Sequence, residues 1–213
     1  MGIAKEPDRV ERIFLLLLAA IMSAICIAAS LAQSAEIIYV FPVRPIDRSA
    51  FSPGGHAYPG IDIFGKKDST FVAPVSGVIE DVQREDEWDK AELSSLSAQT
   101  KRMPLRYKKA GGPEMKGGRW VSLLGDDGFR YYGSHLQGVA HGLNIGSRVQ
   151  AGDVLGYLGN SGNAKDTPIH LHFGISSAST PYSWQTRRGE IEPYPFLTCI
   201  IKKGCNPGKM LHR

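Results

Sequence analysis

The chain has 213 residues, of which 42% are hydrophobic, and its formal net charge is +4. This length is enough for one domain with appendages, and so high an apolar share with so low a charge excludes a disordered chain or an acidic tail. Glycine and proline are frequent, with 24 and 13 residues. Because both interrupt regular elements, the composition favours short strands and many turns over a helical bundle.

The first element is an apolar segment at residues 13–32, with 18 apolar residues and no charge. It is long enough to cross a bilayer as a helix. Three basic residues precede it, whereas the first basic residue after it is Arg44. This bias directs the remainder of the chain out of the cytoplasm.

Small residues at Ser30 and Ala32 form a candidate cleavage site. Residues 1–35 are therefore interpreted as a signal peptide or as an uncleaved signal anchor, and both remain open. We expect an exported protein of the periplasm or cell envelope. If residues 13–32 are retained, they tether it to the inner membrane, and we expect no other contact with a membrane.

Residues 36–213 form the expected domain, with its core at 50–176. Short β-branched or aromatic runs separated by glycine and proline predict strands. These runs lie at residues 37–41, 60–64, 71–75, 77–82, 119–125, 129–136, 147–164 and 169–175. Asp127-Gly128 is a hairpin signal between two of them. The pattern predicts an all-β fold, with an antiparallel β-sandwich or barrel-sandwich hybrid core and a charged, partly helical insertion.

The insertion covers residues 83–118, whose first half is acidic and whose second half is basic. Acid before base complements a helix dipole, and Pro104 would end a helix that begins near Asp86. The insertion is either a solvated excursion between two strands or a lid or docking element over the site. The charges balance locally and the protein is exported, so we expect no nucleic-acid partner.

The C-terminal tail, residues 177–213, contains Cys199 and Cys205. In an oxidising compartment these two can close a small disulfide loop, and a pair of free thiols is the alternative. No histidine or second cysteine pair lies near enough in sequence to favour a metal site there.

The six histidines point to the chemistry. His170 and His172 alternate on one predicted strand, so both imidazoles share a face while Leu171 and Phe173 enter the core. His135 ends another predicted strand. Asp62 lies between two isoleucines and projects away from the core, and a turn at Pro59-Gly60 could bring His56 back to it. Two histidines and an aspartate with an open fourth position are a common catalytic zinc arrangement.

His141 and His212 lie in a glycine-rich loop and at the chain end. We expect both to be exposed to solvent.

In this order, the motifs GIDIF, APVSGVI, RYYGSHL, GSRVQAGDVLGYLGNSGNA and HLHFGI resemble the lysostaphin-type zinc metallopeptidases, a family of peptidoglycan endopeptidases. The resemblance covers about residues 50–176. It implies a β-sheet core that carries one Zn²⁺ ion.

Residue by residue, the resemblance makes Asp62 and His172 metal ligands. His135 and His170 match the two histidines that act on the attacking water and the tetrahedral intermediate. The usual family pattern H-x-G-x-D places the remaining ligand at position 58, which is Tyr58 here. His56 is the substitute, as in a branch of the family written H-x-Y-P-x-x-D-I-F.

The function implied is zinc-dependent hydrolysis of the peptide cross-links of cell-wall peptidoglycan. Export and a disulfide-prone tail suit a Gram-negative periplasm and hence a D-alanyl–diaminopimelate bond, although the sequence does not identify the bond. One alternative is a metal-free relative of the same fold that binds and activates another cell-wall hydrolase. Another is a biotinyl or lipoyl carrier, which residues 159–162 disfavour because they contain no lysine to modify.

Overall fold

A computed structural model describes residues 18, 36–47, 50–53, 56–86, 116–202 and 204–212. The chain divides into two compact units, Met1–Glu36 and Ile37–Arg213. The apolar segment 13–32, apart from Leu18, and the helix expected between Asp86 and Pro104 fall outside the described residues. Within the ranges that are described, no helix is long and apolar enough to cross a membrane.

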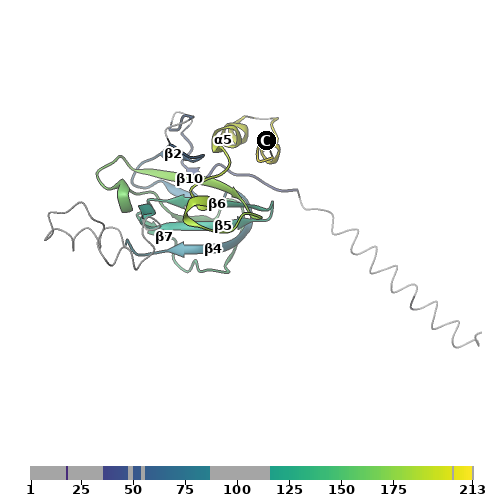
Figure 1. The fold of residues 1–213 in the computed structure, drawn as a ribbon, viewed down its shortest axis with the longest axis horizontal. Coiled ribbons are helices and arrows are strands. Elements are labelled where there is room, and N and C mark those ends of the chain that lie inside the picture. The colour runs from purple at the N-terminus through teal and green to yellow at the C-terminus, as the bar shows by residue number, and fades with distance from the viewer. Residues whose placement is uncertain are drawn as a thin grey trace, which may run out of the picture. The chain divides into compact units, whose positions relative to one another are not determined.

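The described part of the second unit contains two antiparallel sheets, which confirms the all-β prediction. The larger sheet has the order β2 (Ile61–Phe64), β10 (His170–Ser177), β6 (Phe129–Ser134), β5 (Trp120–Gly125), β4 (Gly77–Gln83) and β8 (Arg148–Val149). The smaller sheet has the order β1 (Val43–Arg44), β3 (Thr70–Val72), β9 (Val154–Tyr157) and β7 (Gly138–Val139). Figure 1 shows β2, β10, β6, β5 and β4 side by side.

The strand expected at residues 37–41 is wrong, because the regular ladder begins only at Val43. Pro42 and Pro74 have no N–H to donate, so this stretch cannot form continuous pairing. Isolated bonds run along it instead, from Val40 N to the Pro74 oxygen at 2.7 Å and from Val72 N to the Pro42 oxygen at 2.8 Å. Phe41 still packs into the core and is 1% exposed.

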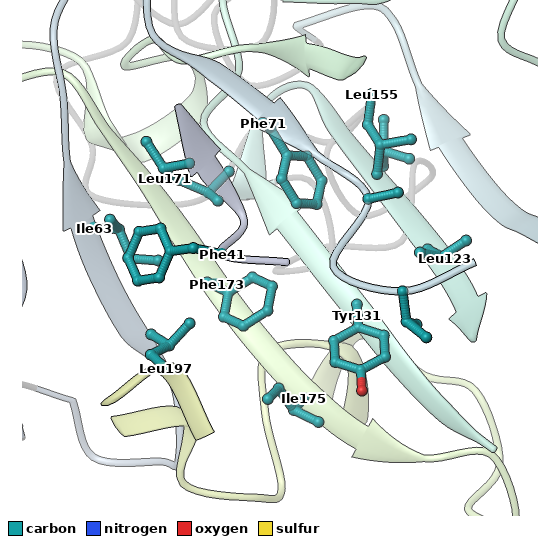
Figure 2. Packing of buried hydrophobic residues seen from close by; sticks show 14 of the residues in the cluster. Phe41, Ile63, Phe71, Leu123, Tyr131, Leu155, Leu171, Phe173, Ile175 and Leu197 are labelled. Carbon is teal, nitrogen blue, oxygen red and sulfur yellow. The ribbon is translucent and has the colours of Figure 1, made fainter. Parts of the chain in front are cut away.

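The core lies between the sheets, where apolar side chains from both meet (Figure 2). Phe71 and Leu155 come from the smaller sheet, and Leu171 and Phe173 come from β10 of the larger one. All four are fully buried. Their burial fixes which face of β10 points inward, and so which face is left for the histidines.

The hairpin signal is confirmed, because β5 and β6 pair through a turn in which the Gly128 N–H donates to the Gly125 oxygen at 3.0 Å. Gly128 has φ +81°, a left-handed conformation that favours glycine. A short 3₁₀ turn, η2 (Gly162–Ala164), lies between β9 and β10.

The C-terminal tail contains helices that the sequence analysis did not predict. These are α4 (Trp184–Arg187), α5 (Pro193–Ile201) and the 3₁₀ turn η3 (Pro207–Met210). Helix α5 has two start signals, Pro193 in its first turn and the Glu192 side chain accepting from Tyr194 N. It buries Phe196 and Leu197 in the core.

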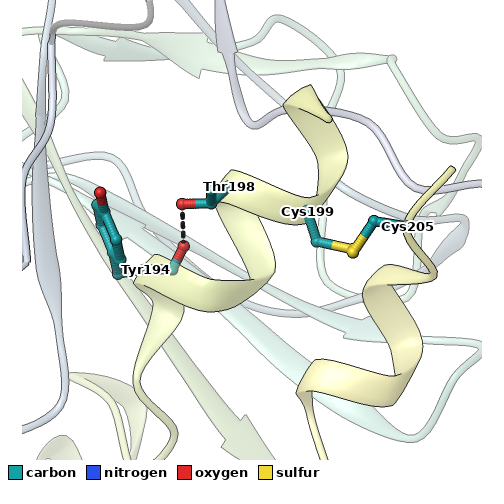
Figure 3. Close-up of a disulfide and its surroundings, with 4 residues drawn as sticks. All are labelled: Tyr194, Thr198, Cys199 and Cys205. Atoms are coloured by element: carbon teal, nitrogen blue, oxygen red, sulfur yellow. Dashed lines mark hydrogen bonds between the residues drawn. A yellow bond between two sulfur atoms is a disulfide. The ribbon is translucent and has the colours of Figure 1, made fainter. Parts of the chain in front are cut away.

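Cys199, in the last turns of α5, is joined to Cys205 by a disulfide, the pairing expected from the sequence (Figure 3). The two Cα atoms are 5.3 Å apart. The bond ties the end of α5 to the segment that leads into η3. Within α5, the Thr198 hydroxyl donates to the Tyr194 carbonyl at 2.7 Å.

Candidate active site

The register between β2 and β10 builds the centre of the site. Asp62 and His172 are direct partners across the two strands, and His170 pairs with Phe64. Residues alternate between faces, so Ile61 and Ile63 are buried at 1% and 0% exposure while Asp62 points to the other side. The sequence prediction of these faces is confirmed.

His56 reaches the same point from the turn before β2. Its Nε2 lies 3.1 Å from Asp62 Oδ1. Gly60, just before β2, lies close to β10 and the segment after it, because a Cβ there would lie 2.8 Å from His172 Cε1 and 2.7 Å from the Arg188 oxygen. The chain therefore folds back at Pro59-Gly60, the turn that the sequence analysis allowed.

His56, Asp62 and His172 offer ligand atoms that all lie within 4.8 Å of one another. His172 Nε2 is 3.2 Å from the Arg188 carbonyl oxygen, which can only accept, so Nε2 carries a proton. In the neutral ring, Nδ1 then turns its lone pair toward Asp62 Oδ1, 3.0 Å away. Two acceptors this close need a proton or a cation near them. Two nitrogens and one oxygen are a donor set that suits zinc, so these residues fit the expected ion.

Electrostatics keep Asp62 in the form that a metal ligand needs. Burial raises the pKa of its carboxyl, but the imidazoles of His172, His170 and His56 outweigh that effect and lower the pKa from 3.8 to about 2. The side chain is therefore a carboxylate at neutral pH.

His135 follows β6 directly and has φ +64°, unusual for a residue other than glycine. Its Nδ1 lies 2.9 Å from the Ser161 carbonyl oxygen, so Nδ1 carries the proton and Nε2 keeps its lone pair. Burial, followed by repulsion from His172 and His170, lowers its pKa from 6.5 to about 3. His135 is therefore neutral and able to accept a proton.

His170 is 5% exposed and lies beside His135, with ring centroids 5.0 Å apart. Its Nδ1 is 2.8 Å from the Pro168 carbonyl oxygen, which fixes the ring orientation. Its Nε2 is 3.9 Å from Asp62 Oδ2. The structure thus brings together His56, Asp62, His135, His170 and His172, whereas His141 and His212 are exposed.

A pocket of about 240 Å³ opens beside this cluster, lined by His135 and His172. Its wall also includes Tyr58, Trp184 and Arg188, which the sequence analysis did not assign to the site. The Arg188 guanidinium carbon lies 4.1 Å from the Tyr58 ring centroid and 4.4 Å from that of Trp184. No sequence signal marks Trp184 or Arg188, because they lie beyond the last predicted strand. The sequence analysis noted Tyr58 only because it occupies the position of a metal ligand in the usual family pattern.

Sequence comparison finds a peptidase family and one curated relative. Residues 106–184 match Peptidase family M23. The L-Ala--D-Glu endopeptidase of Bacillus subtilis (strain 168) is 31% identical over 105 residues, which is 45% of this chain and 31% of that protein. The chain thus spans about a third of the length of this curated relative.

Solved structures found in the comparison include the catalytic domain of lysostaphin from Staphylococcus simulans. It has 22% sequence identity and a TM-score of 0.45, covering 70% of this chain and 89% of that one. A zinc-containing peptidase from Vibrio cholerae has 15% identity and a TM-score of 0.45, covering 71% of this chain and 40% of that one.

The two antiparallel sheets and the family match together support a peptidase. Through residues 106–184, the chain is similar to the peptidases of family M23.

Proposed function

We propose that the chain is an exported zinc endopeptidase that hydrolyses peptide cross-links of cell-wall peptidoglycan. The observation that carries the proposal is the cluster of His56, Asp62 and His172 beside two further buried histidines, in a domain of a peptidase family. A cluster of this composition meets the needs of metal-assisted hydrolysis better than those of packing.

His56, Asp62 and His172 would hold the zinc ion. Bound there, zinc supplies Lewis acidity, which polarises the scissile carbonyl and makes a water molecule acidic near neutral pH. The Arg188 carbonyl orients His172 by accepting a hydrogen bond from its Nε2–H.

His135 and His170 divide the proton transfers. Neutral His135 has a free Nε2 lone pair and accepts the proton of the attacking water. His170, oriented by the Pro168 carbonyl, donates through Nε2 to the developing oxyanion and then to the leaving amine when it is protonated. The water oxygen bonds to the carbonyl carbon, the C–N bond breaks, and the amine leaves with a proton.

The substrate class is supported by the curated relative, whose name describes a peptidase acting between L-Ala and D-Glu. An exported protein would meet such peptides in the cell wall. Residues 1–35 are the export segment in this proposal, and retention of residues 13–32 would keep the domain at the inner membrane.

Zinc analysis and peptidoglycan digestion with the purified full chain test the proposal. We expect one zinc ion per chain and conversion of cross-linked muropeptides into monomers, both lost in Asp62→Ala. Asp126→Ala is the matched control, since Asp126 is exposed on the β5–β6 turn. A wild-type chain without zinc that stimulates another wall hydrolase would instead establish the metal-free activator.

A further inference from the structure

We infer that Arg188 binds a carboxylate of the substrate peptide beside the reacting bond. This inference rests on the proposed function and adds a specificity determinant to it. It concerns a positively charged part of the pocket, beside the proposed metal ligands. This part is formed by Arg188, Tyr58 and Trp184, and we call it the arginine subsite.

The charge of Arg188 is not neutralised within the described part of the chain. Its neighbour Arg187 forms an ion pair with Asp81, in which Arg187 Nη1 lies 3.6 Å from Asp81 Oδ2. No described aspartate or glutamate forms an ion pair with Arg188. Its Nε atom is fully buried and has no hydrogen-bond partner. A buried donor without a partner is costly, so the guanidinium has hydrogen-bonding capacity that the described protein groups do not use.

The pocket that contains Arg188 is positive on its described walls. Three cations, Lys116, Arg187 and Arg188, line it, and no carboxylate is among the described lining residues. Tyr58 and Trp184 confine the guanidinium by their rings, which limits its rotamers before a ligand arrives. A guanidinium held this way presents its in-plane N–H groups, which match a carboxylate in a bidentate pair.

The arginine subsite is coupled to the reacting groups by the backbone. The Arg188 carbonyl accepts from His172 Nε2 at 3.2 Å, so the main chain of Arg188 is fixed to a proposed metal ligand. A carboxylate on Arg188 would therefore lie within the same pocket as the bond that His135 and His172 face. Stem peptides offer this group on D-glutamate or on diaminopimelate, and both share the chemistry that Arg188 would recognise.

Three cross-linked muropeptides test the inference: one with all carboxylates free, one amidated only at D-glutamate, and one amidated only at diaminopimelate. For the wild-type full chain, we expect kcat/KM to fall about tenfold for one amidated form, which identifies the source of the carboxylate. In Arg188→Gln, the ratio of kcat/KM for the free peptide to that for the amidated peptide should be near one. In Arg188→Lys, this ratio should lie between one and the wild-type value. Because the readout is a ratio, a general loss of activity does not imitate it.

Arg148→Gln is the matched control, since it removes the same charge from an exposed arginine on β8, at the sheet edge opposite β2. It should leave the ratio unchanged. A wild-type chain without preference, or an Arg188→Gln variant that keeps the preference, overturns the inference.

Binding of the same three peptides to the zinc-free chain, measured by calorimetry, separates this inference from the proposed function. If no peptide is cut, the proposed function fails. Tighter binding of the free carboxylate that depends on Arg188 then still supports the subsite, and equal binding of all three overturns it.

Discussion

The candidate site has two halves that the fold builds in different ways. The histidine half, with Asp62, His170 and His172, lies on paired strands, where register decides which side chains meet. The arginine subsite comes from the turn before β2 and the segment after β10, which meet only through packing. A strand position is set by alternation along the chain, whereas a loop position depends on what it docks against. Activity should therefore be most sensitive to side-chain substitutions in the histidine half. In the arginine subsite, it should be most sensitive to substitutions that move the backbone.

The largest effect is expected in the histidine half. His135→Gln removes the proton acceptor but no proposed ligand, so kcat should fall by about 10²–10⁴-fold while zinc content is unchanged. Muropeptide release and metal analysis on the same preparation measure both. Loss of zinc in this variant would mean that His135 belongs to the metal site.

The second-largest effect is expected from a substitution that moves the backbone of the arginine subsite. Gly189 has φ +133°, and a Cβ there would lie 1.4 Å from the Pro59 oxygen. Gly189→Ala must therefore displace the turn that carries His56 and Tyr58, and we expect zinc affinity to fall about 10–100-fold. Gly142→Ala is the control, because Gly142 has φ +77° but nothing within 4 Å of its Cβ position. It should cost about 1 kcal/mol of stability and leave zinc affinity intact.

The disulfide tests whether the tail stabilises the domain without shaping either half. Reduction, or the Cys199→Ala/Cys205→Ala double variant, should lower the free energy of unfolding by about 2 kcal/mol, because the closed loop is short. Chemical denaturation measures this change. The kcat of the folded protein should stay the same, and a changed kcat would show that α5 positions the site.

The smallest effect, over a single pH unit, comes from His135 in the zinc-free protein. Its pKa is lowered from 6.5 in the unfolded chain to about 3 in the folded one. Between these values the unfolded state binds more protons, so this contribution to stability is complete above pH 6.5 and is lost as the pH falls. Below 6.5, unfolding free energy should drop by up to about 1.4 kcal/mol per pH unit, and less steeply in His135→Gln. Equal slopes in the two proteins would contradict the lowered pKa.

Much of the histidine half was predictable. The alternation of Ile61, Asp62 and Ile63, and of His170, Leu171 and His172, already separates an inward from an outward face. The sequence was compatible with the approach of His56 to Asp62 but did not predict it. The position of His56 depends on a turn that packs against Arg188 and Gly189.

Other features were missed or placed wrongly for the same reason. The run at 37–41 has strand-like residues, but Pro42 and Pro74 deprive it of a ladder, which depends on what lies beside it. Helix α5 is short, and its burial of Phe196 and Leu197 follows from docking on the core and not from a long repeat.

The sequence by itself determined the all-β class and the outward face of β2 and β10, because these follow from local geometry and spacing. Only the tertiary structure decided that Tyr58, Trp184 and Arg188 share a pocket with the histidines. They lie on segments distant in the chain, and their meeting depends on how the turn before β2 and the chain after β10 pack together. The alternation of side chains along a strand follows from backbone geometry, so it can be predicted from the order of the residues. Contacts between distant loops form only once the core beneath them has formed.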